Sequence, residues 1–172
     1  MNRVSVTQGT YQVSQEPDVI FTAFLGSCVS ACVHDPEMQF GGMNHFLLPE
    51  KAESCSSMDS KIFGSYLMEL LLNDLYRMGA KRGALEVKLF GGAHLLTAGT
   101  DPGRENVDFI TQFMENEGLN VVSSSLRGNQ GRQVEFTPFT GKVRQKLVER
   151  VPDETTRQIA PKQKKFGELD LF

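Results

Sequence analysis

The sequence lacks the features that mark membrane-bound and exported proteins. It contains no apolar run that approaches the length of a membrane span, and its first ten residues, MNRVSVTQGT, carry no signal-peptide core. We therefore expect a cytoplasmic protein with no membrane insertion.

Cysteine is also scarce, and the chain has no excess of positive charge. The chain has three cysteines, Cys28, Cys32 and Cys55, and this odd number is more typical of reduced thiols than of a disulfide framework. A net charge of −3 argues against nucleic acid as the main partner. The length of 172 residues is typical of one domain, which we predict over residues 1–151, and the polar, lysine-rich residues 152–172 are expected to form a flexible tail.

The best-defined stretch runs from Asp18 to Pro49. Val, Ile and Phe dominate it and Gly or Pro marks its breaks, which predicts strands over 18–25, 28–34 and 43–48. Both parities of the first strand are largely apolar, so both of its faces are expected to be covered.

The rest of the chain predicts two amphipathic helices and several further strands. Asp59 can cap a helix that runs to Met78, and a second helix is expected over 104–117, ended by Gly118. The buried stripe of the first helix is predicted to consist of Phe63, Leu67, Leu70, Leu71, Leu75 and Met78. Further strands are expected at 4–13 (an edge strand), 84–90 and 119–125, with a hairpin of 133–138 and 142–148.

Cys28 is the candidate nucleophile. It follows Gly26-Ser27 at a junction between strands, where a tight turn could expose the thiol and aim backbone N–H groups at an oxyanion. A thiol needs a base, and His45 on the next strand but one could supply it, while Thr22 could accept a proton from the imidazole and fix its tautomer. The simpler interpretations are a small buried cysteine, a core histidine and a threonine with ordinary β propensity.

Two other histidines and a zinc site are alternatives. His34 is expected to be exposed at a strand end, and His94, in a loop, is the next candidate base. A zinc site could use Cys28, Cys32, His34 and His45. Along an extended strand, however, Cys28 and Cys32 would lie about 13 Å apart, too far for a shared metal or a disulfide. We therefore expect neither a metal nor a cofactor, with Cys32 in the core and Cys55 an exposed loop thiol.

Several motifs together resemble the CheD family, the chemoreceptor glutamine deamidases of bacterial chemotaxis. They are TAFLGSC (22–28), Asp35-Pro36 and GGMNHFLLP (41–49). Later segments follow in the family's order: KLFGGA (88–93), GRENVDF (103–109), LRGNQGRQVEF (126–136) and TGKV (140–143). The resemblance covers residues from about 10 to about 148 and leaves the tail outside it.

The resemblance implies a fold, a site and partners. The fold would be α/β, a layered sandwich of mixed β-sheets with two main helices, similar to bacterial toxins that deamidate glutamine. Cys28 would be the nucleophile, His45 the base and Thr22 the orienting residue, with Gly26 and Ser27 at the oxyanion. The activity would be that of a protein-glutamine glutaminase acting on methyl-accepting chemotaxis receptors, with receptor methylesterase activity and a CheC-type phosphatase partner as further implications.

Three alternatives stay open from the residues themselves. A Cys–His pair also serves cysteine peptidases and transglutaminase-like acyltransferases, because each passes through an acyl-enzyme. The protein could instead be a non-catalytic chemotaxis adaptor that regulates a phosphatase partner. The C-terminal ELDLF (168–172) could be a docking peptide, with the DNA sliding clamp a remote candidate partner.

Overall fold

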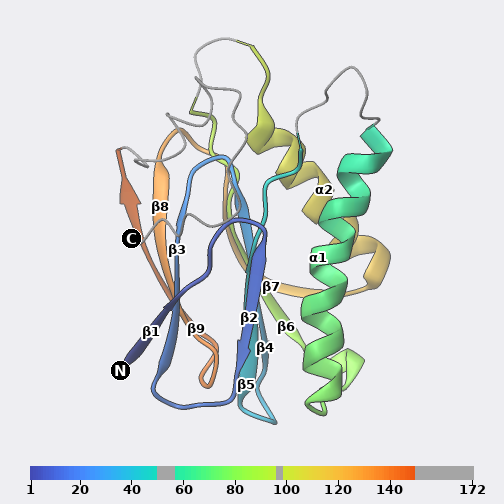
Figure 1. Cartoon of the computed structure of the whole chain (residues 1–172), viewed down its shortest axis with the longest axis vertical. Helices are drawn as coiled ribbons and strands as arrows, with labels where there is room; N and C mark the ends of the chain where they lie inside the picture. Colours follow the sequence, from blue (N-terminus) through green and yellow to red (C-terminus); the bar gives the residue numbers. More distant parts are fainter. Residues whose placement is uncertain (50–56, 96–98, 150–172) are drawn as a thin grey trace, which may run out of the picture.

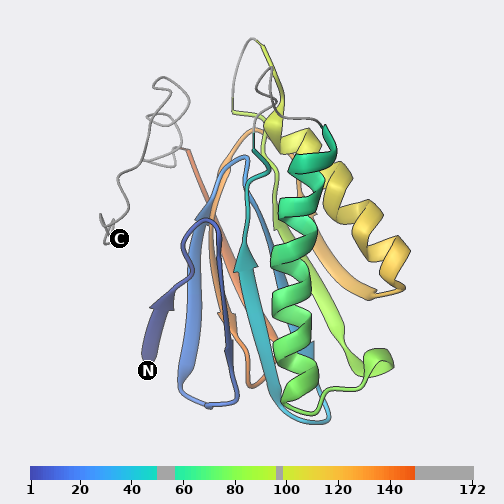
Figure 2. The same cartoon turned by 45° about the vertical axis from the view of Figure 1, so that its right-hand side comes forward.

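The computed structural model describes residues 1–49, 57–95 and 99–149, and these build two mixed sheets with two α-helices along one side (Figures 1 and 2). The first sheet has the order β1 (Asn2–Ser5), β3 (Val19–Leu25), β8 (Gly131–Thr137), β9 (Lys142–Val148). The second has the order β2 (Thr10–Ser14), β5 (Phe40–His45), β4 (Val29–Asp35), β6 (Glu86–Gly91), β7 (Asn120–Leu126). The helices are α1 (Ser57–Arg77) and α2 (Pro102–Glu117), and a 3-10 turn, η1 (Arg82–Ala84), precedes β6. This confirms the predicted α/β layered sandwich.

The second sheet is the middle layer and is covered on both faces. Val29, Ala31 and Val33 of β4 pack with the helices, whereas Cys32 packs with the first sheet. Alternation along a strand sends successive side chains to opposite faces, so the whole of β4 is buried. Every residue of β5 is buried as well, polar ones included.

The prediction that β3 is covered on both faces is confirmed only in part. Phe21, Ala23 and Leu25 face the second sheet, while on the opposite face Ile20 is buried but Phe24 is 37% exposed. The helices lie on the far side of the second sheet, so they give no cover to the outer face of the first (Figure 2). Apolar residues at both odd and even positions indicated a buried strand, but they do not indicate which layer of the fold the strand occupies.

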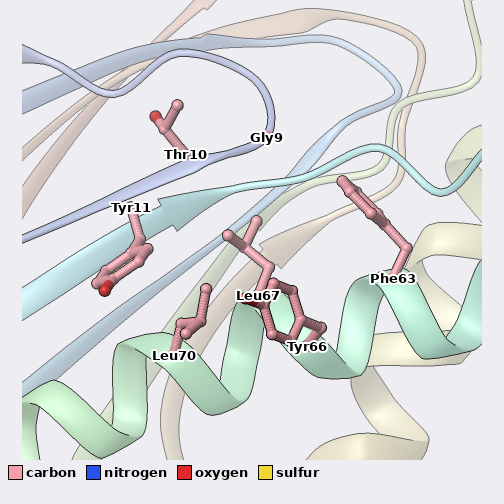
Figure 3. Close-up of a pocket in the computed structure, with 7 residues that line it drawn as sticks. All are labelled: Gly9, Thr10, Tyr11, Phe63, Tyr66, Leu67 and Leu70. Atoms are coloured by element: carbon pink, nitrogen blue, oxygen red, sulfur yellow. The ribbon is translucent and has the colours of Figure 1, made fainter.

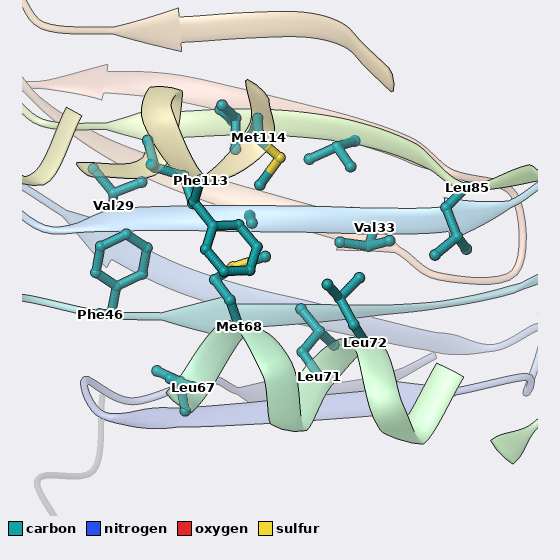
Figure 4. Close-up of a cluster of buried hydrophobic side chains, with 14 of the residues drawn as sticks. Val29, Val33, Phe46, Leu67, Met68, Leu71, Leu72, Leu85, Phe113 and Met114 are labelled. Carbon is teal, nitrogen blue, oxygen red and sulfur yellow. The ribbon is translucent and has the colours of Figure 1, made fainter. Parts of the chain in front are cut away.

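Helix α1 packs on the second sheet through a stripe that differs from the predicted one. Leu67, Leu71 and Leu75 are buried as expected, together with Met68 and Leu72, and Figure 4 shows this face of the helix beside Val29 and Val33. Phe63, predicted to be buried, is 39% exposed, because the true stripe is rotated toward the 68 and 72 positions. The helix also begins at Ser57, so Asp59 lies inside it and is not its cap.

Several other predicted boundaries are corrected. The edge strand expected over 4–13 is two strands, β1 and β2, in different sheets. The strand expected at 43–48 is β5, which begins at Phe40, because Gly41 and Gly42 belong to the ladder and pack against side chains on both sides. The predicted strands at 84–90 and 119–125 correspond to β6 and β7, and the predicted hairpin is β8–β9.

Helix α2 ends at Glu117 as predicted but begins at Pro102, ahead of the predicted start at 104. Asp101 caps it by accepting from the Arg104 N–H, Pro102 occupies its first turn, and Gly118 ends it in the left-handed conformation at φ 63°. Within the described residues, none of the helices combines the length and apolar character needed to cross a membrane. Cys55 and the tail, residues 152–172, lie outside the described residues, so the domain boundary at 151 stays a prediction.

Candidate functional site

The chain crosses from the first sheet to the second at Gly26-Ser27-Cys28, and other segments hold the carbonyl groups of this turn. Gly26 O accepts from Ala93 N at 2.8 Å, and Cys28 O accepts from Gly92 N at 2.8 Å. Ser27 O accepts from the side-chain amide of Asn106, also at 2.8 Å. Three successive carbonyls are thus tied to the segment after β6 and to α2.

The tied carbonyls determine where the adjoining N–H groups point. In a trans peptide the C=O and the following N–H point in opposite directions. The N–H groups of Ser27 and Cys28 therefore point away from the groups that bind Gly26 O and Ser27 O. Such N–H groups beside a nucleophile are the usual donors to an oxyanion.

The strand register brings His45 near Cys28. Val29 and Phe46 exchange backbone hydrogen bonds of 3.0 and 2.9 Å, in the same register as the Cys32–Met43 pair of β4 and β5. If this register is continued, Ser30 lies opposite His45. Cys28 then lies on the same face of the sheet, as a diagonal neighbour of His45. Diagonal neighbours in a sheet lie about 7–8 Å apart, within reach of a long side chain such as histidine.

The orientation of the His45 ring is set by a backbone carbonyl. Its Nδ1 lies 2.9 Å from Val6 O, and a carbonyl oxygen can only accept, so Nδ1 carries the proton. In the neutral ring the lone pair is then on Nε2, the form that a general base requires. Val6 was not a predicted site residue, because a backbone acceptor leaves no signal in the sequence.

Thr22 reaches this arrangement through its main chain. Its carbonyl accepts from Val6 N at 2.8 Å, and Val6 in turn holds His45. Its side chain has the parity of the exposed Phe24 and is opposite to Phe21 and Ala23, which face the core. The structure therefore brings Cys28 and His45 together and connects Thr22 to them by its backbone.

The expectation that the turn exposes Cys28 is wrong. Cys28 is 1% exposed and His45 is 7% exposed. The Cys28 thiol lies 3.8 Å from Oε1 of Gln8, a residue of the turn between β1 and β2 that sequence reasoning did not select. The site is therefore closed in this conformation.

The other candidate ligands and bases occupy different surroundings. His34, expected to be exposed, is buried at 7% and has its Nδ1 2.9 Å from Pro138 O, while His94 is exposed and lies 3.4 Å from Asp101. Cys32 is in the core, as predicted, and burial raises its thiol pKa to about 12. In the part of the chain that the structure describes, no three His, Cys, Asp or Glu side chains gather as a metal site would require.

Asn106 is a second residue that the sequence analysis missed. It is 1% exposed, donates to Ser27 O, and accepts from Leu48 N at 2.9 Å. One amide thus joins the turn of Cys28 to the segment that follows His45. The available signal was a polar side chain at position 106 amid the apolar positions of α2, which marks a buried polar group that needs partners.

An ion pair fixes the segment that holds Cys28 O. Arg127 donates to both carboxylate oxygens of Asp101, at 3.1 and 2.6 Å, and to Gly92 O at 2.9 Å. The hydrogen bond from Arg127, followed by that from the Arg104 N–H, holds the pKa of the Asp101 carboxyl well below its usual range. The turn of Cys28 is therefore supported from outside by a charged network.

A shallow apolar groove of about 300 Å³ lies between β2 and α1 (Figure 3). Its lining is mostly apolar and includes neither Cys28 nor His45: Gly9, Thr10, Tyr11, Phe63, Tyr66, Leu67 and Leu70. It meets the site at Gly9, whose N–H donates to His45 O at 2.7 Å. The groove is a neighbouring feature and not the position of the thiol.

The fold and these contacts define an α/β sandwich protein with a buried histidine on β5 of the middle sheet and a buried cysteine directly before the neighbouring strand β4. The family model described as CheD chemotactic sensory transduction matches residues 47–147. The chain is 44% identical over 174 residues to the "Probable chemoreceptor glutamine deamidase CheD" of Caulobacter vibrioides (strain NA1000 / CB15N), covering 99% of this chain and 93% of that protein.

Proteins of the same printed name from other bacteria give similar matches. That of Caulobacter sp. (strain K31) is 45% identical over 175 residues, 99% of this chain and 93% of that protein. That of Agrobacterium fabrum (strain C58 / ATCC 33970) is 47% identical over 143 residues, 83% of this chain and 78% of that protein. The chain belongs to the CheD family.

Proposed function

We propose that this protein is an amidohydrolase that deamidates glutamine side chains of chemoreceptors. Relatives named as probable chemoreceptor glutamine deamidases align over nearly all of this chain. The observation that carries the mechanism is the hydrogen bond between His45 Nδ1 and Val6 O, because it leaves the imidazole in the tautomer that can deprotonate a nearby thiol.

The first half of the reaction forms a thioester. His45 takes the thiol proton, and Cys28 Sγ attacks the carbon of the glutamine side-chain amide. The S–C bond forms while the carbonyl π electrons move to oxygen, and the N–H groups of Ser27 and Cys28 donate to that oxyanion, with Gly26 completing the turn. The C–N bond then breaks, and ammonia leaves with a proton from the His45 imidazolium.

The second half regenerates the thiol. His45 removes a proton from a water molecule, whose oxygen attacks the thioester carbon. The C–S bond breaks, Cys28 recovers its proton, and the product is a glutamate side chain. Thr22 contributes by holding Val6, and through it the ring of His45, with its main-chain carbonyl.

The proposal includes the setting and partners that the resemblance implies. The protein would act in the cytoplasm on the cytoplasmic parts of methyl-accepting receptors, without a cofactor. The same acyl-enzyme would form from a glutamyl methyl ester, with methanol as the leaving group, so methylesterase activity is compatible with the site. A CheC-type phosphatase would be a regulatory partner.

Mass spectrometry of receptor cytoplasmic fragments tests the activity. Wild type should convert specific glutamines to glutamate and release ammonia without cutting the chain, and Cys28→Ala should abolish both. Equal conversion by the two proteins would contradict the assignment. A cut chain or an isopeptide product would indicate a peptidase or an acyltransferase, and a Cys28→Ala protein with full biological effect would indicate the non-catalytic adaptor.

A further inference from the structure

The closed site contains a carboxamide that belongs to the protein itself. We propose that the side chain of Gln8 occupies the subsite for the amide of the substrate glutamine, and that the substrate must displace it. This inference rests on the proposed deamidase function and adds to it a residue that sets the substrate affinity of the site.

The contact between Gln8 and the thiol is the first observation. Gln8 Oε1 lies 3.8 Å from Cys28 Sγ. The Gln8 side chain ends in the same CH₂–CO–NH₂ group as a substrate glutamine. A carboxamide oxygen beside the nucleophile stands where the carbonyl under attack would stand, so the two amides cannot occupy this position at the same time.

The turn that carries Gln8 is tied to His45 at both ends. Before Gln8, Val6 O binds His45 Nδ1, and after it, Gly9 N donates to His45 O at 2.7 Å. Thr10 closes the turn, because its N–H and its hydroxyl both donate to Thr7 O, at 3.0 and 2.7 Å. The backbone is therefore held in place while the side chain of Gln8 extends to the thiol.

Burial shows why displacement is needed. Cys28 and His45 are 1% and 7% exposed, so a glutamine from another protein cannot reach the thiol in this conformation. Gln8 itself is half-buried, with the exposed Gly9 next to it, so its side chain can turn toward solvent without unfolding a strand. The fraction of molecules with Gln8 displaced then scales the apparent affinity for substrate.

Alkylation of Cys28 by iodoacetamide tests the inference without a receptor. Gln8→Ala should raise the rate several-fold, on the order of threefold to tenfold, because the thiol is no longer covered. Gln8→Glu should have the opposite effect and shift the pH profile upward, since a carboxylate beside the thiol raises its pKa. Gln12→Ala is the matched control, because Gln12 is an exposed glutamine four residues further along the same segment, and its rate should equal that of wild type.

Kinetics on receptor fragments give the second readout. Gln8→Ala should lower KM by a similar factor and leave kcat unchanged, because displacement precedes chemistry. If Gln8→Ala is alkylated at the same rate as Gln12→Ala, or if an active Gln8→Ala enzyme has an unchanged KM, the proposed role of Gln8 is overturned. A wild type that alkylates at Cys28 but does not deamidate would overturn the proposed function instead.

Discussion

The two sides of the candidate site are held in different ways. The cysteine side is fixed by buried groups: Asn106 and the backbone of Gly92 and Ala93 bind the three carbonyls of its turn. The histidine side is held by the turn Val6–Thr10, in which Val6 is buried and the other four residues are half-buried or exposed. Cys28 and the N–H groups of its turn are therefore held by buried groups alone, whereas His45 is held by a turn that runs from the buried Val6 to the surface.

This difference separates two requirements of the proposed reaction. Oxyanion donors must be in place before charge develops, which favours rigid backbone groups. Access of a protein substrate requires something near the thiol to move, and the half-buried side chain of Gln8 is suited to that. Disturbing the cysteine side should therefore lower kcat, while changes at the histidine-side turn should act mainly on substrate binding.

Asn106→Asp should have the largest effect, since it replaces the donor to Ser27 O with an oxygen that repels it. We expect kcat for deamidation to fall by up to about 10²-fold, as when one oxyanion donor is lost. Alkylation of Cys28, which has no oxyanion, should stay within about twofold of wild type. Steady-state kinetics and alkylation rates measure the two effects separately.

Asn44→Asp is the matched control for Asn106→Asp. Asn44 is also fully buried, and its Oδ1 accepts from Ala31 N at 2.9 Å, away from the nucleophile turn. Both variants should lose stability, but the ratio of deamidation to alkylation should change in Asn106→Asp alone. If both ratios change equally, or if neither does, Asn106 has no special part in orienting the turn.

Asp101→Asn should loosen the outer support of the cysteine side. The loss of a charge-assisted pair should lower Tm by about 5 °C at pH 7. The folded-state pKa of Asp101 lies below its unfolded value, so the stabilisation is complete above the unfolded pKa of about 3.9 and is lost as pH falls toward the folded pKa. The Tm gap between wild type and variant should be constant from pH 7 to about pH 5 and shrink below about pH 4. A gap independent of pH would show that the ion pair is not its source.

Thr22→Ala should have the smallest effect. Thr22 holds Val6 with its carbonyl, which alanine retains, so the deamidation rate should stay within about twofold of wild type. His45→Ala, by contrast, should lose most of the activity. A loss in Thr22→Ala comparable to that in His45→Ala would show that the hydroxyl acts in the site, despite its parity with the exposed Phe24.

Local patterns predicted the helices and most strands, and the resemblance to the CheD family implied the layered sandwich, but neither indicated how the strands divide between the sheets. Residues 4–13 look like one strand, yet the turn at Gln8-Gly9 sends β2 to the second sheet. The pattern of apolar residues indicates that a face of a strand is buried, but not which layer covers it. For this reason β3 was expected to be covered on both faces, and β4 was not identified as the strand that is buried throughout. Pairing and layer order depend on contacts between segments far apart in sequence.

The sequence predicted those members of the candidate site whose side chains have distinctive chemistry. Cys28 and His45 could be selected because thiol and imidazole are rare and reactive groups. Val6 acts through a carbonyl, and Asn106 and Gln8 act from segments 78 residues after and 20 residues before the cysteine. Their roles depend on tertiary placement, which an isolated sequence does not reveal.

The most direct test of the Cys28–His45 pair is peptide-resolved alkylation across a pH series. Protonated His45 should favour the Cys28 thiolate, since an opposite charge within about 4–6 Å lowers a thiol pKa. Cys28 and Cys32 are both 1% exposed, so labelling of Cys28 near neutral pH requires the site to open, and its rate should fall in His45→Ala across the pH series. Cys32, whose thiol pKa burial raises to about 12, should stay unlabelled in the folded protein. A Cys28 equally reactive in wild type and His45→Ala would contradict the proposed pair and make His94 the next base to test.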